Sequence, residues 1–390
     1  MESLSGVRVL PGRHGTWYTG NGRSILATEQ VQPLTPPDEV RRAIEDNGLL
    51  DTHERRYGAT VMLTTRCNLT CSYCFQNESF DDSGLARIDR KDLTAQTATL
   101  ARDFVSEQMH KYGKSELQLL LTGGEPLIKF RRCLEVLDAM AALNLTQASM
   151  FTNGVLLTQA RAVALAQSGL THIQVSFDGA ATLHDEYRKT TAGMGSYGRI
   201  MENLASAIDA AASLKVTARL NVNARNLTSL DDLLRTLSQF DAASRLSIRF
   251  GLVDDIGLNF SDAPERSEET AKRIRELALH ALDLGLHVQP MAAPGDCLFC
   301  GVVGGASGCV INADGTLYSC WESVGRTGFE VGDLTHGYMP MHDLADRWVD
   351  CSYNVTDAQA SKTAARRISD IVDAAVLDHA YELRYPGSAA

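Results

Sequence analysis

The stretch CNLTCSYCF, residues 67–75, places three thiols close together directly after the apolar run 60–64. Cysteines with this spacing, three and then two residues apart, can wrap three corners of one metal cluster. A zinc loop would need a fourth ligand nearby, and none of the neighbouring residues is His or Cys. Three unrelated core cysteines are the other alternative. The spacing favours a metal cluster held by Cys67, Cys71 and Cys74.

From about residue 59 the sequence alternates between strand and helix patterns, which argues for parallel strands joined by crossover helices. The expected strands are 60–64, 117–122, 148–152, 172–177, 216–222 and 246–253. The expected helices are 94–112, 133–143, 158–167, 196–214, 230–240 and 267–284. This order predicts an α/β fold, a partial (β/α)6 barrel, with its chemistry at the C-terminal ends of the strands.

Glycine and polar residues gather at these predicted strand ends. Gly123 and Gly124 let the backbone approach a ligand closely, and the Glu125 carboxylate can receive an ammonium group. Arg188 has the donor fork that suits a carboxylate, although a surface salt bridge to a neighbouring acid is the alternative. Arg249 on the sixth strand either reaches a substrate or forms a structural ion pair. Further candidates at the barrel mouth are Asn153, Ser176, Asp178, Asn221 and Asn223.

A second group of cysteines follows the barrel pattern. The runs 310–312 and 316–318, joined by an Asp-Gly turn, predict a β-hairpin that brings Cys309 and Cys320 towards each other. With Cys297 and Cys300 these four thiols are enough for a complete cluster, and a structural zinc ribbon could use the same set. Cys351 is a reserve ligand. Cys133, which stands apart in a helical pattern, is expected to be a buried structural thiol.

The cysteine loop, the GGEP segment 123–126 and the SFDG segment 176–179 resemble motifs of radical S-adenosylmethionine (SAM) enzymes. In that family three thiolates hold a 4Fe-4S cluster, and the fourth iron takes the amino and carboxylate groups of SAM. The resemblance implies these contacts to SAM: Tyr73 near the adenine, Gly123, Gly124 and Glu125 at the amino group, Ser176 and Arg188 at the carboxylate, Asn223 at the ribose, and Asn153 and Asp178 beside them.

The second cysteine group resembles the SPASM and twitch modules of the same superfamily. Cys300, Gly315 and Cys320 match the opening signature of those modules. The resemblance implies one auxiliary 4Fe-4S cluster, held by Cys297, Cys300, Cys309 and Cys320, beside the SAM-binding one. A full SPASM domain carries a further dense set of cysteines, of which only Cys351 is present. Glu322 is a speculative catalytic proton acceptor near this module.

Composition narrows the remaining possibilities. The formal charge of −11, without a long Lys/Arg cluster, makes nucleic acid a poor first substrate. The sequence shows neither an export signal nor a run of 18 apolar residues, which predicts a cytoplasmic protein without a membrane span. A length of 390 residues predicts two to three structural units. The expected divisions are an N-terminal extension 1–57, the barrel 58–288, the auxiliary-cluster module 289–350 and a helical tail 351–390.

The resemblance implies an enzyme that reductively cleaves SAM to a 5′-deoxyadenosyl radical and abstracts hydrogen from a substrate. The leading expectation is modification of a ribosomally synthesised peptide, by crosslink, thioether, epimerisation or oxidation. The alternative is a dehydrogenase or epimerase acting on a small molecule such as an aminoglycoside sugar. A non-enzymatic iron-sulfur electron-transfer or scaffold protein is the third class. Flavodoxin or ferredoxin is the expected electron donor, and residues 1–57 either bind a leader peptide or serve as packing.

Overall fold

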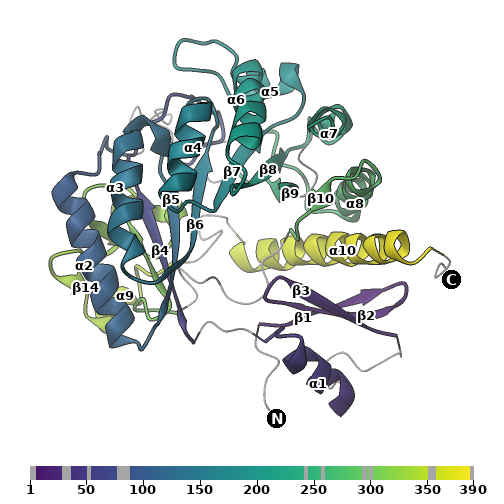
Figure 1. Cartoon of the computed structure of the whole chain (residues 1–390), viewed down its shortest axis with the longest axis horizontal. Helices are drawn as coiled ribbons and strands as arrows, with labels where there is room; N and C mark the ends of the chain where they lie inside the picture. The colour runs from purple at the N-terminus through teal and green to yellow at the C-terminus, as the bar shows by residue number, and fades with distance from the viewer. Residues whose placement is uncertain are drawn as a thin grey trace.

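A parallel β-sheet forms the centre of the computed structural model, which describes residues 6–28, 37–50, 54–76, 88–240, 245–255, 260–291, 297, 302–349 and 357–386. Its strands lie side by side in chain order (Figure 1). They are β4 (Arg56–Met62), β5 (Glu116–Thr122), β6 (Leu145–Thr152), β7 (His172–Phe177), β8 (Lys215–Val222) and β9 (Leu246–Leu252). This arrangement confirms the predicted α/β partial barrel, and each predicted strand is present with shifts of a few residues at its ends.

Helices cover the outer face of the sheet, as Figure 1 shows. They are α2 (Ala95–Lys111), α3 (Phe130–Ala141), α4 (Gln159–Gln167), α6 (Tyr197–Ala210), α7 (Leu230–Leu237) and α8 (Glu268–Asp283), with the shorter η1 (Pro126–Lys129) and α5 (Ala181–Tyr187) between them. Thr94, Thr158 and Ser267 each accept a hydrogen bond from the third backbone amide of the helix that follows. These caps satisfy amides that would otherwise lack a partner, so the helices begin where the sequence predicts.

The two faces of the sheet differ in chemistry because side chains alternate along each strand. On β8, Val216, Ala218 and Leu220 are fully buried in the main core under the helices. The residues between them, including Arg219 and Asn221, face the concave side of the barrel. The apolar face therefore stabilises the fold, and the polar concave face is available for ligands.

The C-terminal module extends the same sheet. Strand β11 (Gly308–Ile311) pairs in parallel with β4, and β12 (Thr316–Tyr318), β13 (Glu330–Asp333) and β14 (Gly337–Tyr338) follow antiparallel, while β10 (His287–Val288) pairs with β9 at the other edge. The predicted hairpin is present as β11 and β12, and Gly315 takes a φ of +92° in its turn. The short η2 (Trp321–Ser323) and α9 (Met341–Leu344) complete the module. Sequence patterns did not indicate that it would pair with the barrel.

The two ends of the chain pack together. Strands β1 (Arg8–Gly12), β2 (Gly15–Gly20) and β3 (Arg23–Ala27) form a separate antiparallel sheet, followed by α1 (Asp38–Asp46). The long helix α10 (Ala358–Arg384) lies between this sheet and α8 (Figure 1). Strand β3 was not predicted, and the four-part division of the chain stays a prediction. No helix in the described ranges is long and apolar enough to cross a membrane.

Candidate functional site

The cysteine loop begins where β4 ends, at the C-terminal edge of the sheet. The backbone amide of Thr70 donates to the carbonyl of Lys189 over 2.9 Å, and that of Thr191 donates to the carbonyl of Asn68 over 3.2 Å. Within the loop, the amide of Cys74 donates to the carbonyl of Cys71. The loop is thus tied to the segment just after Arg188, which is remote in sequence.

Tyr73 joins this loop to the ends of two other strands. Its hydroxyl donates to the two carboxylate oxygens of Asp178, at 2.8 and 2.7 Å. The same oxygen accepts from Nη1 of Arg188 at 2.9 Å and from Nδ2 of Asn221 at 3.1 Å. Burial raises the pKa of Tyr73 well above its ordinary value, so the phenol stays protonated and keeps its donor. The structure therefore brings together four predicted residues in one buried polar cluster.

His184 supports this cluster and was not singled out by its sequence pattern. Its Nδ1 lies 3.4 Å from the amide nitrogen of Asp178, which can only donate, so Nδ1 accepts and Nε2 carries the proton. Nε2 then donates to Oγ of Ser196 at 3.1 Å, and Ser196 donates to the carbonyl of Arg188 at 2.7 Å. Burial lowers the pKa of His184 to about 2, which keeps the ring neutral. The histidine thus positions the backbone on both sides of the cluster.

Glu125 is fully buried, and its carboxylate already accepts three hydrogen bonds. They come from the amide of Leu127 at 2.9 Å, the hydroxyl of Thr152 at 2.8 Å and the amide of Asn153 at 2.8 Å. Burial raises the pKa of Glu125, although these three hydrogen bonds act to lower it. The carboxylate therefore fixes the end of β6 next to the cysteine loop, and its contact with a SAM ammonium group stays a prediction.

Gly123 and Gly124 pack tightly against the chain that leads into the cysteine loop. A Cβ on Gly123 would lie 2.3 Å from the carbonyl oxygen of Thr64, and one on Gly124 would lie 2.3 Å from that of Arg66. The Gly124 amide donates to the Thr64 carbonyl over 2.8 Å. The close approach that glycine permits here is to the protein's own backbone, which sets the position of the loop relative to β5.

The three loop thiols suit an iron-sulfur cluster. Cys67 Sγ accepts from the amide of Leu69 at 3.4 Å and from Nδ2 of Asn153 at 3.7 Å. Burial raises the pKa of both Cys67 and Cys71 to about 12, and the neighbouring thiols add to this effect. Such thiols lose their protons readily only to a bound metal. In the described chain no three His, Cys, Asp or Glu side chains converge as for a single ion, whereas a cluster spreads its thiolates over different irons.

Two buried donors near the loop have no partner among the residues that the structure describes, namely Nε of Arg188 and Nδ2 of Asn223. The Asn223 side-chain oxygen is engaged, because it accepts from the amides of Arg225 and Asn226. An unsatisfied buried donor is costly, so these two atoms fit polar groups of a bound ligand. Ser176 lies on the concave face of β7, beside Arg219 in the strand register. These positions are compatible with the predicted SAM contacts.

The second cysteine group is only partly described. Cys309 is buried in the core beside Tyr57. Burial raises the pKa of Cys309 to about 12, although a hydrogen bond with that tyrosine acts to lower it. Cys320 is buried at the start of η2, and Cys297 is half-buried. Cys300 and Cys351 lie outside the described residues. The hairpin thus forms as predicted, but Cys309 has the surroundings of a core thiol. The auxiliary cluster stays a prediction.

Glu322 lies on η2, and its negative charge acts on the guanidinium of Arg219. The neighbouring Trp321 makes an edge contact with Phe151 of β6, with ring centroids 6.1 Å apart. The C-terminal module therefore meets the concave side of the barrel at η2. The position of Glu322 is compatible with contact to a substrate held there.

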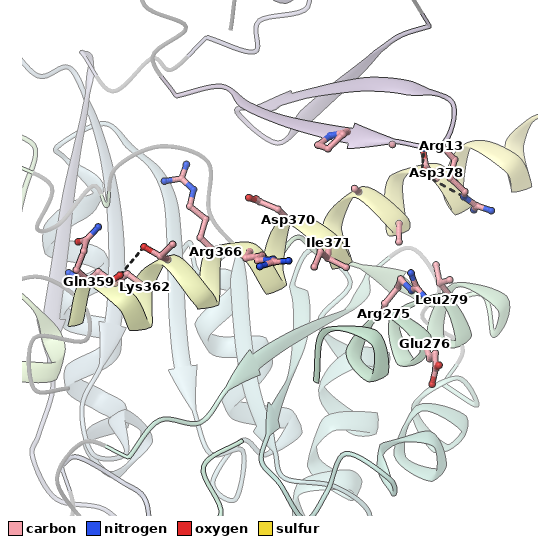
Figure 2. A pocket seen from close by; sticks show the side chains of 16 residues that line it. Arg13, Arg275, Glu276, Leu279, Gln359, Lys362, Arg366, Asp370, Ile371 and Asp378 are labelled. Carbon is pink, nitrogen blue, oxygen red and sulfur yellow. Dashed lines mark hydrogen bonds and ion pairs between the residues drawn. The ribbon is translucent and has the colours of Figure 1, made fainter. Parts of the chain in front are cut away.

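A groove between β1, α8 and α10 lies outside this site (Figure 2). Among its described lining residues are the basic side chains of Arg13, Arg275, Lys362 and Arg366. It contains none of the residues that the sequence predicts for the site. The candidate site is therefore the edge of the sheet at the cysteine loop, together with the concave face behind it.

Known proteins resemble this chain over its barrel. The molybdenum cofactor biosynthesis protein 1 of Drosophila melanogaster is 32% identical over 50% of this chain and 31% of its own length. A probable GTP 3′,8-cyclase of Methanocella arvoryzae is 34% identical over 43% of this chain and 48% of its own length. The chain thus spans a third to a half of these curated relatives.

Solved structures share the fold over more of the chain. A structure of anSMEcpe with bound AdoMet and the Cp18Cys peptide has a TM-score of 0.58 at 14% identity, covering 84% of this chain and 99% of that one. Streptococcus suis SuiB bound to S-adenosylmethionine has a TM-score of 0.53 at 12% identity, covering 92% and 90%. The family model of the radical SAM superfamily matches residues 61–237. This match covers the cysteine loop and most of the barrel, and over these residues the chain is similar to the radical SAM superfamily.

Proposed function

We propose that the chain is a radical SAM enzyme in which Cys67, Cys71 and Cys74 hold a 4Fe-4S cluster. The observation that carries the proposal is the loop of three thiols tied through Tyr73 to the ends of β7 and β8. When bound, the cluster and SAM supply a 5′-deoxyadenosyl radical that removes a hydrogen atom from a substrate carbon. The protein's task is to hold that carbon in place and to exclude water.

Different residues of the site have different roles in holding SAM and the cysteine loop. The unpartnered Nε of Arg188 and Nδ2 of Asn223 bind polar groups of SAM, with Ser176 beside them. Glu125 and Asn153 keep the end of β6 against the cysteine loop. Asp178 and Tyr73 hold the Arg188 guanidinium, since both lie within hydrogen-bond reach of its Nη1. Glu322 remains our candidate for accepting a substrate proton, and flavodoxin or ferredoxin for the electron donor.

An auxiliary 4Fe-4S cluster completes the proposal. Cys297, Cys300 and Cys320 are its first three ligands. The fourth is Cys309 or Cys351. One observation favours Cys351: Ser319, next to Cys320, donates to the carbonyl of Val349 at 2.7 Å and accepts from its amide at 2.9 Å. This pair holds Val349, the last described residue before Cys351, against the residue next to Cys320, whereas Cys309 is engaged with Tyr57.

Two substrate classes follow from different observations. A peptide is supported by the fold likeness to anSMEcpe, which was solved with a peptide, over 84% of this chain. A small molecule is supported by the curated relatives that are GTP 3′,8-cyclases, whose matches span between 32% and 75% of each protein. We place the peptide first because the peptide-bound neighbour covers more of the chain. A small molecule such as GTP or an aminoglycoside sugar is the second candidate.

Iron content and SAM cleavage test the proposal. Anaerobic reconstitution is expected to give about eight irons per chain, in two four-iron clusters. Replacing Cys67, Cys71 and Cys74 by Ala should halve the iron and abolish reductive SAM cleavage. Cleavage that survives this change contradicts the central assignment. Cys351→Ala and Cys309→Ala, compared side by side, identify the fourth auxiliary ligand as the one whose loss lowers the iron content.

A further inference from the structure

Arg219 and Arg249 lie side by side on the concave face of the barrel. They are direct neighbours in the parallel register of β8 and β9, where paired residues are about 4.8 Å apart. The residues flanking each arginine, such as Leu220 and Ile248, are buried under the helices, so the arginines point the other way. Both are only half-buried, which leaves them accessible from the concave side.

Neither guanidinium forms an ion pair with any residue that the structure describes. Nε of Arg219 donates to Oδ1 of Asn221 at 2.9 Å, and Nη2 of Arg249 donates weakly to the carbonyl of Met291 at 3.4 Å. Two like charges on adjacent strands repel each other, and a pair without a counter-ion is costly. The sequence alternative of a structural ion pair for Arg249 is therefore wrong for the described residues.

Most of the carboxylates near this pair form ion pairs with other arginines. Four of them act on the two guanidinia, namely Asp178, Glu322 and Asp254 on Arg219 and Asp373 on Arg249. Asp178 pairs with Arg188, Asp254 with Arg266 and Asp373 with Arg8. Glu322 acts on Arg219 through its charge. The concave face thus carries more positive charge than these carboxylates offset.

A layer of hydrogen-bonded polar side chains lies directly below the arginine pair. Nε2 of Gln289 donates to the hydroxyls of Thr217 and Ser247, at 3.0 and 2.7 Å, and this closes the layer one step below the arginines. Above them, Gly251 leaves room for the Arg219 guanidinium, because a Cβ there would lie 2.5 Å from its Nη2. Asn221 then links Arg219 to Tyr73 in the cysteine loop.

Burial lowers the pKa of Arg249 to about 10, and the charge of Arg219 adds to that effect. Burial likewise lowers the pKa of Arg219, although the four acidic or phenolic groups around it act to raise it. Both side chains remain protonated at neutral pH. An oxyanion between them would relieve the repulsion and supply the acceptors that the donors lack.

We propose that Arg219 and Arg249 bind an oxyanion of the substrate, a carboxylate or a phosphate group, and thereby determine which substrates the barrel accepts. The role of that anion in the reaction rests on the proposed function. Its binding does not, because the two arginines belong to the barrel and need neither a cluster nor SAM. A peptide would supply a carboxylate, and a nucleotide would supply phosphate.

Binding of simple anions to the chain as purified tests the proposal. Inorganic pyrophosphate and succinate are titrated separately by calorimetry, and the thermal midpoint is followed in parallel. We expect one of them to bind and to raise the midpoint. Arg219→Gln and Arg249→Gln should each weaken that binding by about 10- to 100-fold, the range for losing one charged hydrogen bond. Arg235→Gln, at an exposed ion pair with Asp232, is the matched control and should bind normally.

The unliganded variants separate this role from a structural one. If the arginine pair awaits an anion, Arg249→Gln relieves repulsion, and its thermal midpoint in anion-free buffer stays level or rises. A lower midpoint together with unchanged anion binding overturns the proposal, as does equal binding to all three variants. Pyrophosphate binding assigns phosphate as the source, and succinate binding assigns a carboxylate. Failure to cleave SAM with intact anion binding would defeat the proposed function and leave this inference standing.

Discussion

The phenol oxygen of Tyr73 lies 2.8 and 2.7 Å from the two carboxylate oxygens of Asp178, although 105 residues separate them in the chain. The first residue belongs to the cysteine loop, and the second follows the last residue of β7. Arg188 and Asn221 donate to the same phenol oxygen. One hydroxyl group of the cysteine loop therefore contacts residues that follow β7 and residues of β8.

Tyr73→Phe should loosen that attachment. The change removes a hydroxyl that has three partners, and it leaves the buried Asp178 with fewer donors. We expect the free energy of unfolding to fall by about 1–3 kcal/mol, measured by denaturant titration. The Thr70 amide should exchange faster with deuterium, because its bond to Lys189 depends on the loop position. Tyr385→Phe, on a ring that is 49% exposed, is the control. Equal losses in both variants would show that the Tyr73 hydroxyl contributes nothing specific.

Gly124→Ala should disturb the junction between β5 and the cysteine loop. The added methyl group would lie 2.3 Å from the Arg66 carbonyl oxygen, and backbone must move to admit it. We expect a loss of stability of about 1–3 kcal/mol, together with lower SAM cleavage. Gly198→Ala places the same methyl group on α6, where no atom lies within 4 Å. That control should be neutral or slightly stabilising, and a loss as large as that of Gly124→Ala would refute the steric argument.

His184 should give the protein a distinct loss of stability in acid. Burial lowers the pKa of His184 from 6.5 to about 2, so between these values the unfolded chain binds a proton that the folded chain excludes. Stability from this residue is present above pH 6.5 and falls by about 1.4 kcal/mol per pH unit as the pH drops below it. His184→Gln should flatten this slope. The measurement is the free energy of unfolding between pH 4 and pH 7, a window that extends roughly two pH units below the ordinary histidine pKa of 6.5.

The control for this pH effect is His336→Gln, because the side chain of His336 is 81% exposed. That variant should keep the slope of the unmodified protein. A slope that His184→Gln leaves unchanged would mean that the buried ring is protonated in the folded chain.

Local patterns were enough to predict the barrel. Strands such as β7 alternate apolar and polar residues, and helices such as α2, α4 and α8 begin at a capping residue. Both patterns are visible in the local sequence alone. The pairing of β11 with β4 was not predictable in this way. It joins Cys309 to Ala59 across 250 residues, and nothing in either segment specifies the other.

The residues of the candidate site likewise include some that local sequence patterns predict and some that they do not. The cysteine spacing, Glu125 and Arg188 were recognisable because each stands in a short motif. His184 was not, because it acts through contacts with the Asp178 amide and with Ser196, which no local motif specifies. The glycines of residues 123–124 were assigned to ligand approach, and the structure shows that they admit the protein's own backbone. Sequence spacing therefore indicates which side chains are candidates for chemistry, and it does not indicate a residue such as His184 that positions them.

The N-terminal sheet offers a last prediction, which concerns how it is attached. Asp378 of α10 is buried and accepts from Nε1 of Trp17 at 2.8 Å and from the amide of Arg13 at 2.7 Å. Figure 2 shows Asp378 beside Arg13. Asp378→Ala removes the acceptor of both, at a cost of about 1–3 kcal/mol for each buried donor. Hydrogen exchange should then accelerate in β1–β3.

Exchange in β5–β9 should not change, because Trp17 and Leu10 pack with α10 in a small cluster separate from the main core. Asp283→Ala is the control, since it removes an exposed acceptor of His379 on the other side of α10 and should leave β1–β3 protected. Faster exchange throughout the barrel would mean that the sheet and the barrel unfold as one unit. Faster exchange confined to β1–β3 would show that the first residues form a separately docked element, free to have a binding role of its own.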